Sequence, residues 1–446
     1  MRVHRLLPLT ALTVAMAGLV NVTYGADLLS LYREAAAQDP AMAAARASLS
    51  AARERVAQAE GSNGFATGVA AGANANYFDL HVRNLPQAHT DRAYLAANVQ
   101  AFVNKPLYRP ANDAAIEQAN VAVKLSELSL KAAEMDVANR LAQAYFDVLL
   151  AQDNVRLVEA QKAALSEQLA QAKRNFEVGT ATIVDTNEAQ SRYDQVLAQE
   201  ISARNEVDRT RWALRNVVGR FETNLKTLRG NAQVSLPTPA SMEAWVSRAE
   251  REAYPVQIAQ QTLAVSEYDV KRAEAAKSWT LDATANVSHT QSSGSSTSGL
   301  GTWTYAGLVG VTFNLPFDTT GGLSARIRET LALVDKNRND LETARRTAGL
   351  SVRQAYLGVT SGVAGVAAQQ QALKSAETQL ASTKLGLEVG VRTNLDVLNA
   401  QQQVTQVQRD LAQARYNTLL NDLRLKAATG VLGENDLRAT NAYLTD

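Results

Sequence analysis

Residues able to do catalytic or metal chemistry are few in this chain, and they are not grouped. The 446 residues include no cysteine and only four histidines, of which His81, His89 and His289 fall in or beside segments expected to be polar loops. Without cysteine the chain has no disulfides, thiolate zinc sites or iron–sulfur ligation. It contains no P-loop, HExxH, GxSxG or dinucleotide-binding fingerprint. We therefore expect no enzyme activity, cofactor or metal site.

Charge does not point to a polyanionic partner. The chain has 45 basic and 44 acidic side chains, and it carries no acidic or basic tail. A protein dedicated to nucleic acid neutralises many phosphates with clustered Lys and Arg, so this balance speaks against nucleic-acid binding.

The N-terminus is typical of an export signal. Arg2, His4 and Arg5 precede an apolar run of about 15 residues, and Gly25 and Ala26 supply small residues at the expected cut. A membrane anchor is disfavoured because spanning a bilayer needs about 20 apolar residues. We expect residues 1–26 to be removed on export, and a membrane-inserted part of the mature chain would then have to be built from strands.

The chain that follows the expected export signal contains an internal sequence repeat. Residue pairs of the same or similar type recur 211 positions apart, which is difficult to obtain by chance over such a span. We interpret residues 27–237 and 238–446 as two structural repeats, each running helix, β-hairpin, long helix and return helix. The pairs are Ala144 and Ala355, Tyr145 and Tyr356, Gly179 and Gly390, Asp185 and Asp396, Gln190 and Gln401, and Gly219 and Gly430.

Two unusually long helices are predicted. Apolar residues recur at strict seven-residue spacing from Ile116 to Ala172, the stripe of a helix in a coiled-coil-like layer. The pattern runs from about residue 112 to 177 and is repeated from about 324 to 388, which at 1.5 Å per residue gives helices of roughly 100 Å. Return helices are expected over about 185–218 and 396–429.

Two β-hairpins are expected, over about residues 65–104 and 280–314. Apolar residues alternate with polar ones between Ala93 and Asn104 and between Thr280 and Thr290. Strands of this length suit a tilted bilayer crossing, but four strands cannot close a barrel, so several copies must share one. Two, three or four copies would give 8, 12 or 16 strands. A soluble sheet with one wet face is the weaker alternative.

At the ends of the long helices the residues resemble the TolC family of outer-membrane channel-tunnel proteins, the exit ducts of efflux pumps and type I secretion systems. The resemblance covers essentially the whole mature chain in order, spacing and doubling. It is carried most densely by Phe176-Glu177-Val178-Gly179-Thr180, Arg192-Tyr193-Asp194, Glu388-Val389-Gly390-Val391-Arg392-Thr393-Asn394-Leu395-Asp396, and Phe313-Asn314-Leu315-Pro316-Phe317.

The resemblance implies a mainly α chain with a small β part, a homotrimer with a shared 12-stranded barrel in outer-membrane lipid, and a long periplasmic α-helical barrel. It also implies passive conduction from an inner-membrane transporter, ABC or proton-driven, together with a periplasmic adaptor. A trimeric coiled-coil surface or adhesive protein remains the alternative, although it would not need two matched hairpins.

The same resemblance implies a gate at the periplasmic helix tips. Asp185 and Arg392 match a charged pair that ties inner to outer helices, and Asp396 matches an acidic ring whose like charges would raise its pKa. Asn399 stands where the family has a second acidic residue, and Leu387 replaces a tyrosine of the latch. We therefore expect a less negative constriction and a lighter lock.

Adaptors of the family dock at the tips themselves. The resemblance places that surface on two turns, each centred on a glycine, which on local grounds alone is a helix cap. The residues of the expected docking tips are Val178, Gly179, Thr180, Val389, Gly390 and Val391.

Overall fold

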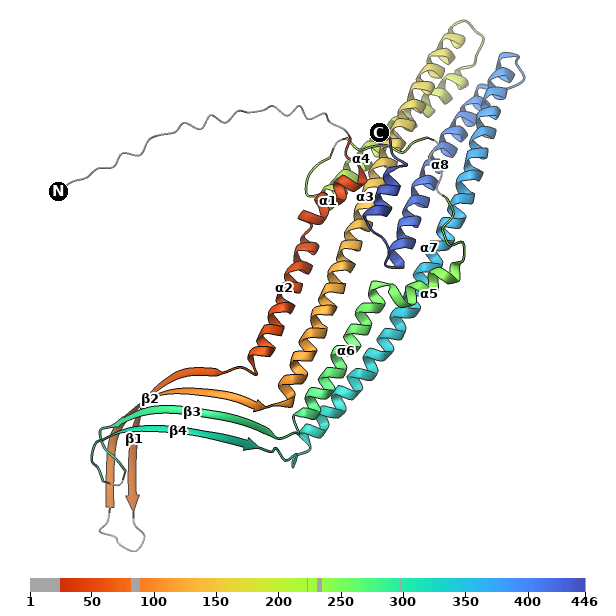
Figure 1. The fold of residues 1–446 in the computed structure, drawn as a ribbon. Helices are drawn as coiled ribbons and strands as arrows, with labels where there is room; N and C mark the ends of the chain where they lie inside the picture. Colours follow the sequence, from red (N-terminus) through yellow and green to blue (C-terminus); the bar gives the residue numbers. More distant parts are fainter. Residues whose placement is uncertain (1–24, 82–88, 223, 231–234, 297, 446) are drawn as a thin grey trace, which may run out of the picture.

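The computed structural model describes residues 25–81, 89–222, 224–230, 235–296 and 298–445. Most of the expected export signal, and the loop between the first two strands, therefore lie outside the described residues. The described chain is elongated, with a four-stranded sheet at one end and the tips of two helical hairpins at the other (Figure 1). The prediction of a mainly helical chain with four strands is confirmed.

Two long helices run the length of the helical body. Helix α3 spans Pro110–Glu177 and α7 spans Gly322–Glu388, with 68 and 67 residues. Pro110 occupies the first turn of α3, where its missing N–H costs no hydrogen bond, so this helix begins two residues earlier than the periodicity predicted.

Each long helix is covered by two shorter ones. Along α3 lie α2 (Pro40–Gly61) on the sheet side and α4 (Ile183–Val218) on the tip side (Figure 1). Along α7 the same places are taken by α6 (Tyr254–Ala275) and α8 (Asn394–Ala428). The covering helices are shorter than α3 and α7, so each covers only a part of the length of its long helix.

Short helices pack around the middle of the body. Helix α1 (Leu28–Gln38) is separated from α2 by Asp39, whose carboxylate caps α2, and Pro40 occupies the first turn of α2. Helix α5 (Met242–Glu252) packs on α7 and α9 (Glu434–Asn441) on α1, so the C-terminus lies beside the helical body (Figure 1).

The core is concentrated where α1, α3, α4, α8 and α9 meet. Tyr145, Phe146 and Tyr416 are all but fully buried there, with the Phe146 ring 5.6 Å from Tyr145 and 5.8 Å from Tyr416. The Tyr145 hydroxyl donates to the backbone carbonyls of Lys226 (2.7 Å) and Ala26 (3.3 Å), which fixes the first described residues to the chain after α4.

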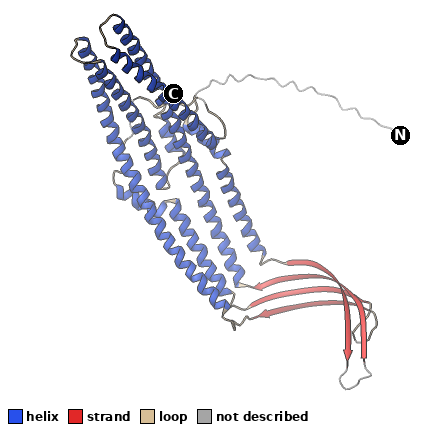
Figure 2. Ribbon diagram, turned by 180° about the vertical axis from the view of Figure 1, so that it is seen from behind, coloured by secondary structure: helices blue, strands red, loops and turns tan. Residues whose placement is uncertain are grey.

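The sheet is antiparallel throughout, in the order β1, β2, β3, β4. Its strands are Ala66–His81, His89–Tyr108, Thr280–Ser292 and Thr302–Asn314, and they leave the helical body as one curved layer (Figure 2). Strand β2 runs past the expected end at residue 104, and a bulge between Pro106 and Tyr108 admits the proline, which cannot donate to the ladder.

Candidate gate at the hairpin tips

The first tip joins α3 to α4 through residues 178–182. Gly179 has a φ of +77°, a conformation that is strained for residues with a Cβ. The amides of Thr180 and Ala181 both donate to the Asn175 carbonyl, at 2.8 and 3.2 Å. These bonds satisfy the last carbonyls of α3 and reverse the chain within five residues.

The second tip repeats this geometry between α7 and α8. Gly390 has a φ of +80°, and the amides of Val391 and Arg392 donate to the Gly386 carbonyl at 2.9 and 3.1 Å. Each bond lies 211 positions from its counterpart in the first tip. The two expected docking tips thus have the same backbone conformation and hydrogen bonds, although docking itself stays a prediction.

Both return helices begin with a reciprocal cap. The Thr393 amide donates to the Asp396 carboxylate at 2.9 Å, and the Asp396 amide donates to the Thr393 hydroxyl at 3.2 Å. Thr182 and Asp185 form the same pair at the same distances. A carboxylate held by a backbone N–H, a hydroxyl and the positive end of the helix dipole remains ionised.

The hydrogen bonds of the caps lower the pKa of both aspartates. For Asp185 the main cause is the Thr182 side chain, and for Asp396 it is the Thr393 backbone amide, with a smaller contribution from the charge of Arg392. Within one chain the direction is therefore opposite to the increase expected for Asp396. Repulsion between several copies requires an assembly and stays a prediction.

Apolar side chains project into solvent at the tips. Val178, Val389 and Val391 are 72, 66 and 75% exposed, and Ile183 and Val184 continue this apolar surface on α4. Each exposed valine flanks a tip glycine, so the turn holds it away from the helix packing. Clustered exposed apolar groups of this kind commonly mark an interaction site.

Three of the four expected gate residues lie together, and the fourth does not. Arg392, Asp396 and Asn399 line one hollow of about 630 Å³ between α7 and α8. Asp185 is on the other hairpin and forms no ion pair with Arg392 within the chain; its carboxylate is bound to the Thr182 cap. The expected Asp185–Arg392 tie is therefore not an intrachain contact, and between chains it stays a prediction.

The position of Arg392 depends on Gly386. A Cβ at residue 386 would lie only 2.7 Å from the Arg392 Cγ, so the arginine stem rests on helix backbone that carries no side chain. The first tip has Asn175 at the corresponding place and Ala181 in place of the arginine. The second tip is thus modified to carry a cation.

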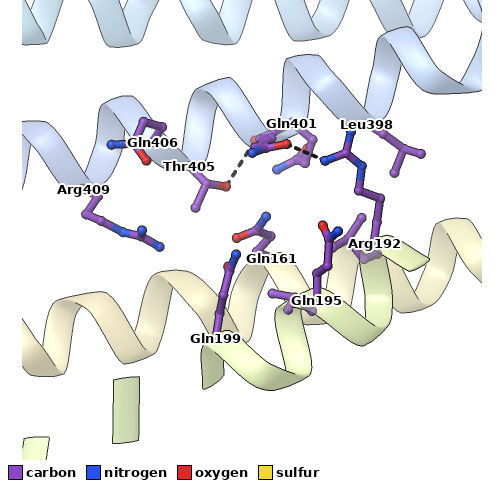
Figure 3. Close-up of a pocket in the computed structure, with 12 residues that line it drawn as sticks. Gln161, Arg192, Gln195, Gln199, Leu398, Gln401, Thr405, Gln406 and Arg409 are labelled. Atoms are coloured by element: carbon purple, nitrogen blue, oxygen red, sulfur yellow. Dashed lines mark hydrogen bonds between the residues drawn. The ribbon is translucent and has the colours of Figure 1, made fainter. Parts of the chain in front are cut away.

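The structure also shows a link between the hairpins that the sequence did not reveal. The Arg192 guanidinium on α4 donates to the Gln402 side chain on α8 at 3.0 Å, the dashed line at Arg192 in Figure 3. It also donates to the Asn399 side chain on α8 at 3.2 Å. Asn399 is thereby an acceptor as well as a lining residue. No local pattern connects residues 207 positions apart on two separate helices.

Aromatic rings mark both ends of the sheet. Trp303 and Tyr305 on strand β4 lie edge to face with centroids 5.9 Å apart. At the helical end Tyr108, Trp279 and Phe313 stack with centroid distances of 4.1 and 5.7 Å, a group that sequence reasoning missed because its members come from three segments.

Within the described residues, no three His, Asp or Glu side chains converge on a position fit for a metal ion. Among the described helices, none combines the length and apolarity required to cross a bilayer.

Residues 31–220 and 245–431 match the outer membrane efflux protein family. The chain is 29% identical to outer membrane protein TolC of Vibrio cholerae serotype O1, covering 99% of this chain and 98% of that protein. It is 31% identical to alkaline protease secretion protein AprF of Pseudomonas aeruginosa, over 71% of this chain and 66% of that protein.

Solved structures share the fold. The outer membrane protein VceC of Vibrio cholerae superposes with a TM-score of 0.76 at 19% identity, covering 90% of this chain and 96% of VceC. The CmeC outer membrane channel of Campylobacter jejuni gives 0.77 at 15% identity, covering 94 and 90%.

Proposed function

Because the chain belongs to the outer membrane efflux protein family, we propose that it is an outer-membrane exit duct. It conducts substrate passively from an inner-membrane transporter, ABC or proton-driven, to the exterior. The relatives include proteins named for efflux and for protease secretion, and the duct serves one of these two kinds of system.

The sheet carries this proposal because one of its faces is apolar and exposed. Val69, Val99 and Val309 are 74, 49 and 86% exposed on one face, whereas Asn98, Gln100 and their cross-strand partners Thr290 and Ser288 share the other. A water-soluble sheet buries its apolar face on a core. Here that face meets lipid and the polar face meets a water-filled lumen.

The distance between the two aromatic groups fits a bilayer. From Trp303 to Phe313 strand β4 advances ten residues, roughly 33 Å along the strand. With the tilt of about 40° that is usual in membrane barrels, this becomes a band of about 25 Å. The aromatic groups then lie at the two interfaces, where such rings are enriched.

The open edges of the sheet require further copies of the chain. Within the chain β1 and β4 each pair on one side only, and unpaired strand edges are not tolerated in lipid. We propose a homotrimer with 12 strands, whose helical hairpins continue as a tunnel through the periplasm. A periplasmic adaptor docks at the exposed valines of the tips.

The native mass of the protein, extracted from outer membranes in mild detergent with the detergent contribution subtracted, tests the duct. Three copies per particle are expected. A monomer, or a protein recovered without detergent, would refute the shared pore and favour a surface protein without a channel.

Conduction tests the gate separately. Arg392→Ser should raise single-channel conductance in planar bilayers, because it removes the cation seated on Gly386. Asp396→Ala should weaken block by divalent cations. Unchanged conductance and block in both variants, with a conducting wild type, would contradict the gate while leaving the duct intact.

A further inference from the structure

The contacts within each helical hairpin differ in kind from the contacts between the two hairpins. Within the tip half of the first hairpin Leu169, Ala172 and Ala189 form an apolar cluster, and Ala376, Val404 and Val407 do so in the second. These clusters hold each hairpin together as a unit. Leu398 is the α8 residue that joins an apolar cluster of α3 and α4.

Beside Leu398 the seam between the hairpins is polar. It encloses a hollow of about 60 Å³, large enough for water but not for a substrate molecule (Figure 3). Amide side chains exchange hydrogen bonds with water at little net cost, so opening the polar part of the seam costs little, and Leu398 is the α8 residue whose apolar contacts with α3 and α4 would be lost. Its lining includes Gln161, Gln195, Gln199, Gln401, Gln402 and Gln406.

Arg192 closes the tip-side end of this seam. Its Nη1 donates to Gln402 Oε1 and its Nη2 to Asn399 Oδ1, so one planar guanidinium spans two acceptors three residues apart on α8. Lysine could not reproduce this fork. Both acceptors are neutral, and the neighbouring Asp194 carboxylate instead accepts from Gln190 on its own helix.

We propose that Arg192, through Asn399 and Gln402, is the intrachain clasp that sets the spacing of the two hairpins in the closed duct. The inference rests on the proposed gated duct and adds to it a positioning residue. The charged guanidinium strengthens these hydrogen bonds enough to bias the spacing of the hairpins. Because both acceptors are neutral, the clasp is weaker than an ion pair and is released when a partner binds the tips.

Asn399→Asp gives the decisive test, since it converts the acceptor at 3.2 Å into a carboxylate. If Arg192 acts as the clasp, Asn399→Asp strengthens it, and the conductance of the purified assembly in planar bilayers falls by about 1.5- to 5-fold. This factor corresponds to the usual strength of an exposed ion pair. Arg192→Ala raises conductance and removes the effect of Asn399→Asp. If Asn399 acts instead as a tunnel charge position, Asn399→Asp increases cation selectivity whether or not Arg192 is present, and the clasp is refuted.

Gln406→Ala is the matched control. Gln406 lines the same seam, but its side chain donates to Asp410 on its own helix at 2.9 Å. Conductance should therefore stay at the wild-type value. A change as large as that of Arg192→Ala would assign the effect to the seam as a whole and overturn the specific role of Arg192.

Thiol labelling separates the clasp from the duct. The natural chain has no cysteine, so Gln195→Cys introduces a single reporter on the α4 side of the seam. Arg192→Ala in that background should speed maleimide labelling several-fold. Faster labelling in a protein that never conducts would refute the duct and retain the clasp, whereas unchanged labelling and conductance in a conducting protein would refute the clasp.

Discussion

The tip glycines allow a prediction whose sign can be calculated from backbone conformation alone. Gly390 has a φ of +80°, and a Cβ built on it meets nothing within 4 Å. Gly390→Ala therefore introduces no clash, and its whole cost is the left-handed conformation, about 1–2 kcal/mol. The population of the opened second tip should rise about 5- to 30-fold.

Gly365 provides a control with the same chemical change and the opposite sign. It lies within α7, a Cβ built on it also meets nothing within 4 Å, and its φ is not positive. Since alanine is the better helix former, Gly365→Ala should stabilise α7 by about 1 kcal/mol.

Amide hydrogen exchange followed by mass spectrometry measures both effects in the detergent-solubilised protein. Peptides covering residues 385–396 should exchange faster in Gly390→Ala, and peptides around residue 365 should exchange no faster in Gly365→Ala. Equal protection of the tip in wild type and Gly390→Ala would show that the turn does not depend on the left-handed conformation of Gly390. The calculated cost of the substitution would then be wrong.

Three further perturbations test other contacts of the chain. The pKa values of Asp185 and Asp396 are lowered, so both caps contribute stability above pH 4 and lose it as the pH falls further. Amide exchange at the tips, corrected for its intrinsic pH dependence, should therefore be constant from pH 8 to 5. A rise in exchange near pH 6 that disappears in Asp396→Asn would instead show repulsion between copies of the chain. Arg109 binds Asp282 through two bonds of 2.9 and 2.8 Å at the sheet–helix junction, so Arg109→Ala should lower the melting temperature of the assembly, and adding Asp282→Asn should recover part of it; no recovery would contradict an unpaired-charge penalty. Tyr145→Phe should cost about 1 kcal/mol and expose the chain around Ala26 to proteolysis, which an unchanged digestion pattern would contradict.

The local features of the fold were predictable because they are encoded within short windows. Seven-residue spacing identified α3 and α7, and two-residue alternation identified the strands, each within a few residues of the observed bounds. The break between α1 and α2 at Pro40 is equally local, because proline acts on its immediate neighbours. Gly179 and Gly390 were recognisable as caps for the same reason.

Contacts between distant segments were not predictable in this way. The stack of Tyr108, Trp279 and Phe313 brings together three segments, and Arg109 with Asp282 joins two repeats. Single residues of such common types carry no local signal of their partner. The resemblance placed Asp185 and Arg392 as a pair, yet within the chain Asp185 is held by Thr182, three residues away.

The period, length and doubling of the elements are encoded locally, because backbone propensity and the burial of one face act over a few residues. Which polar side chains meet depends on how the helices pack. The hairpins are joined near their tips through Leu398 and the Arg192 hydrogen bonds to Asn399 and Gln402. Such contacts depend on the rotation and offset of whole helices, which are fixed only when all the layers pack together.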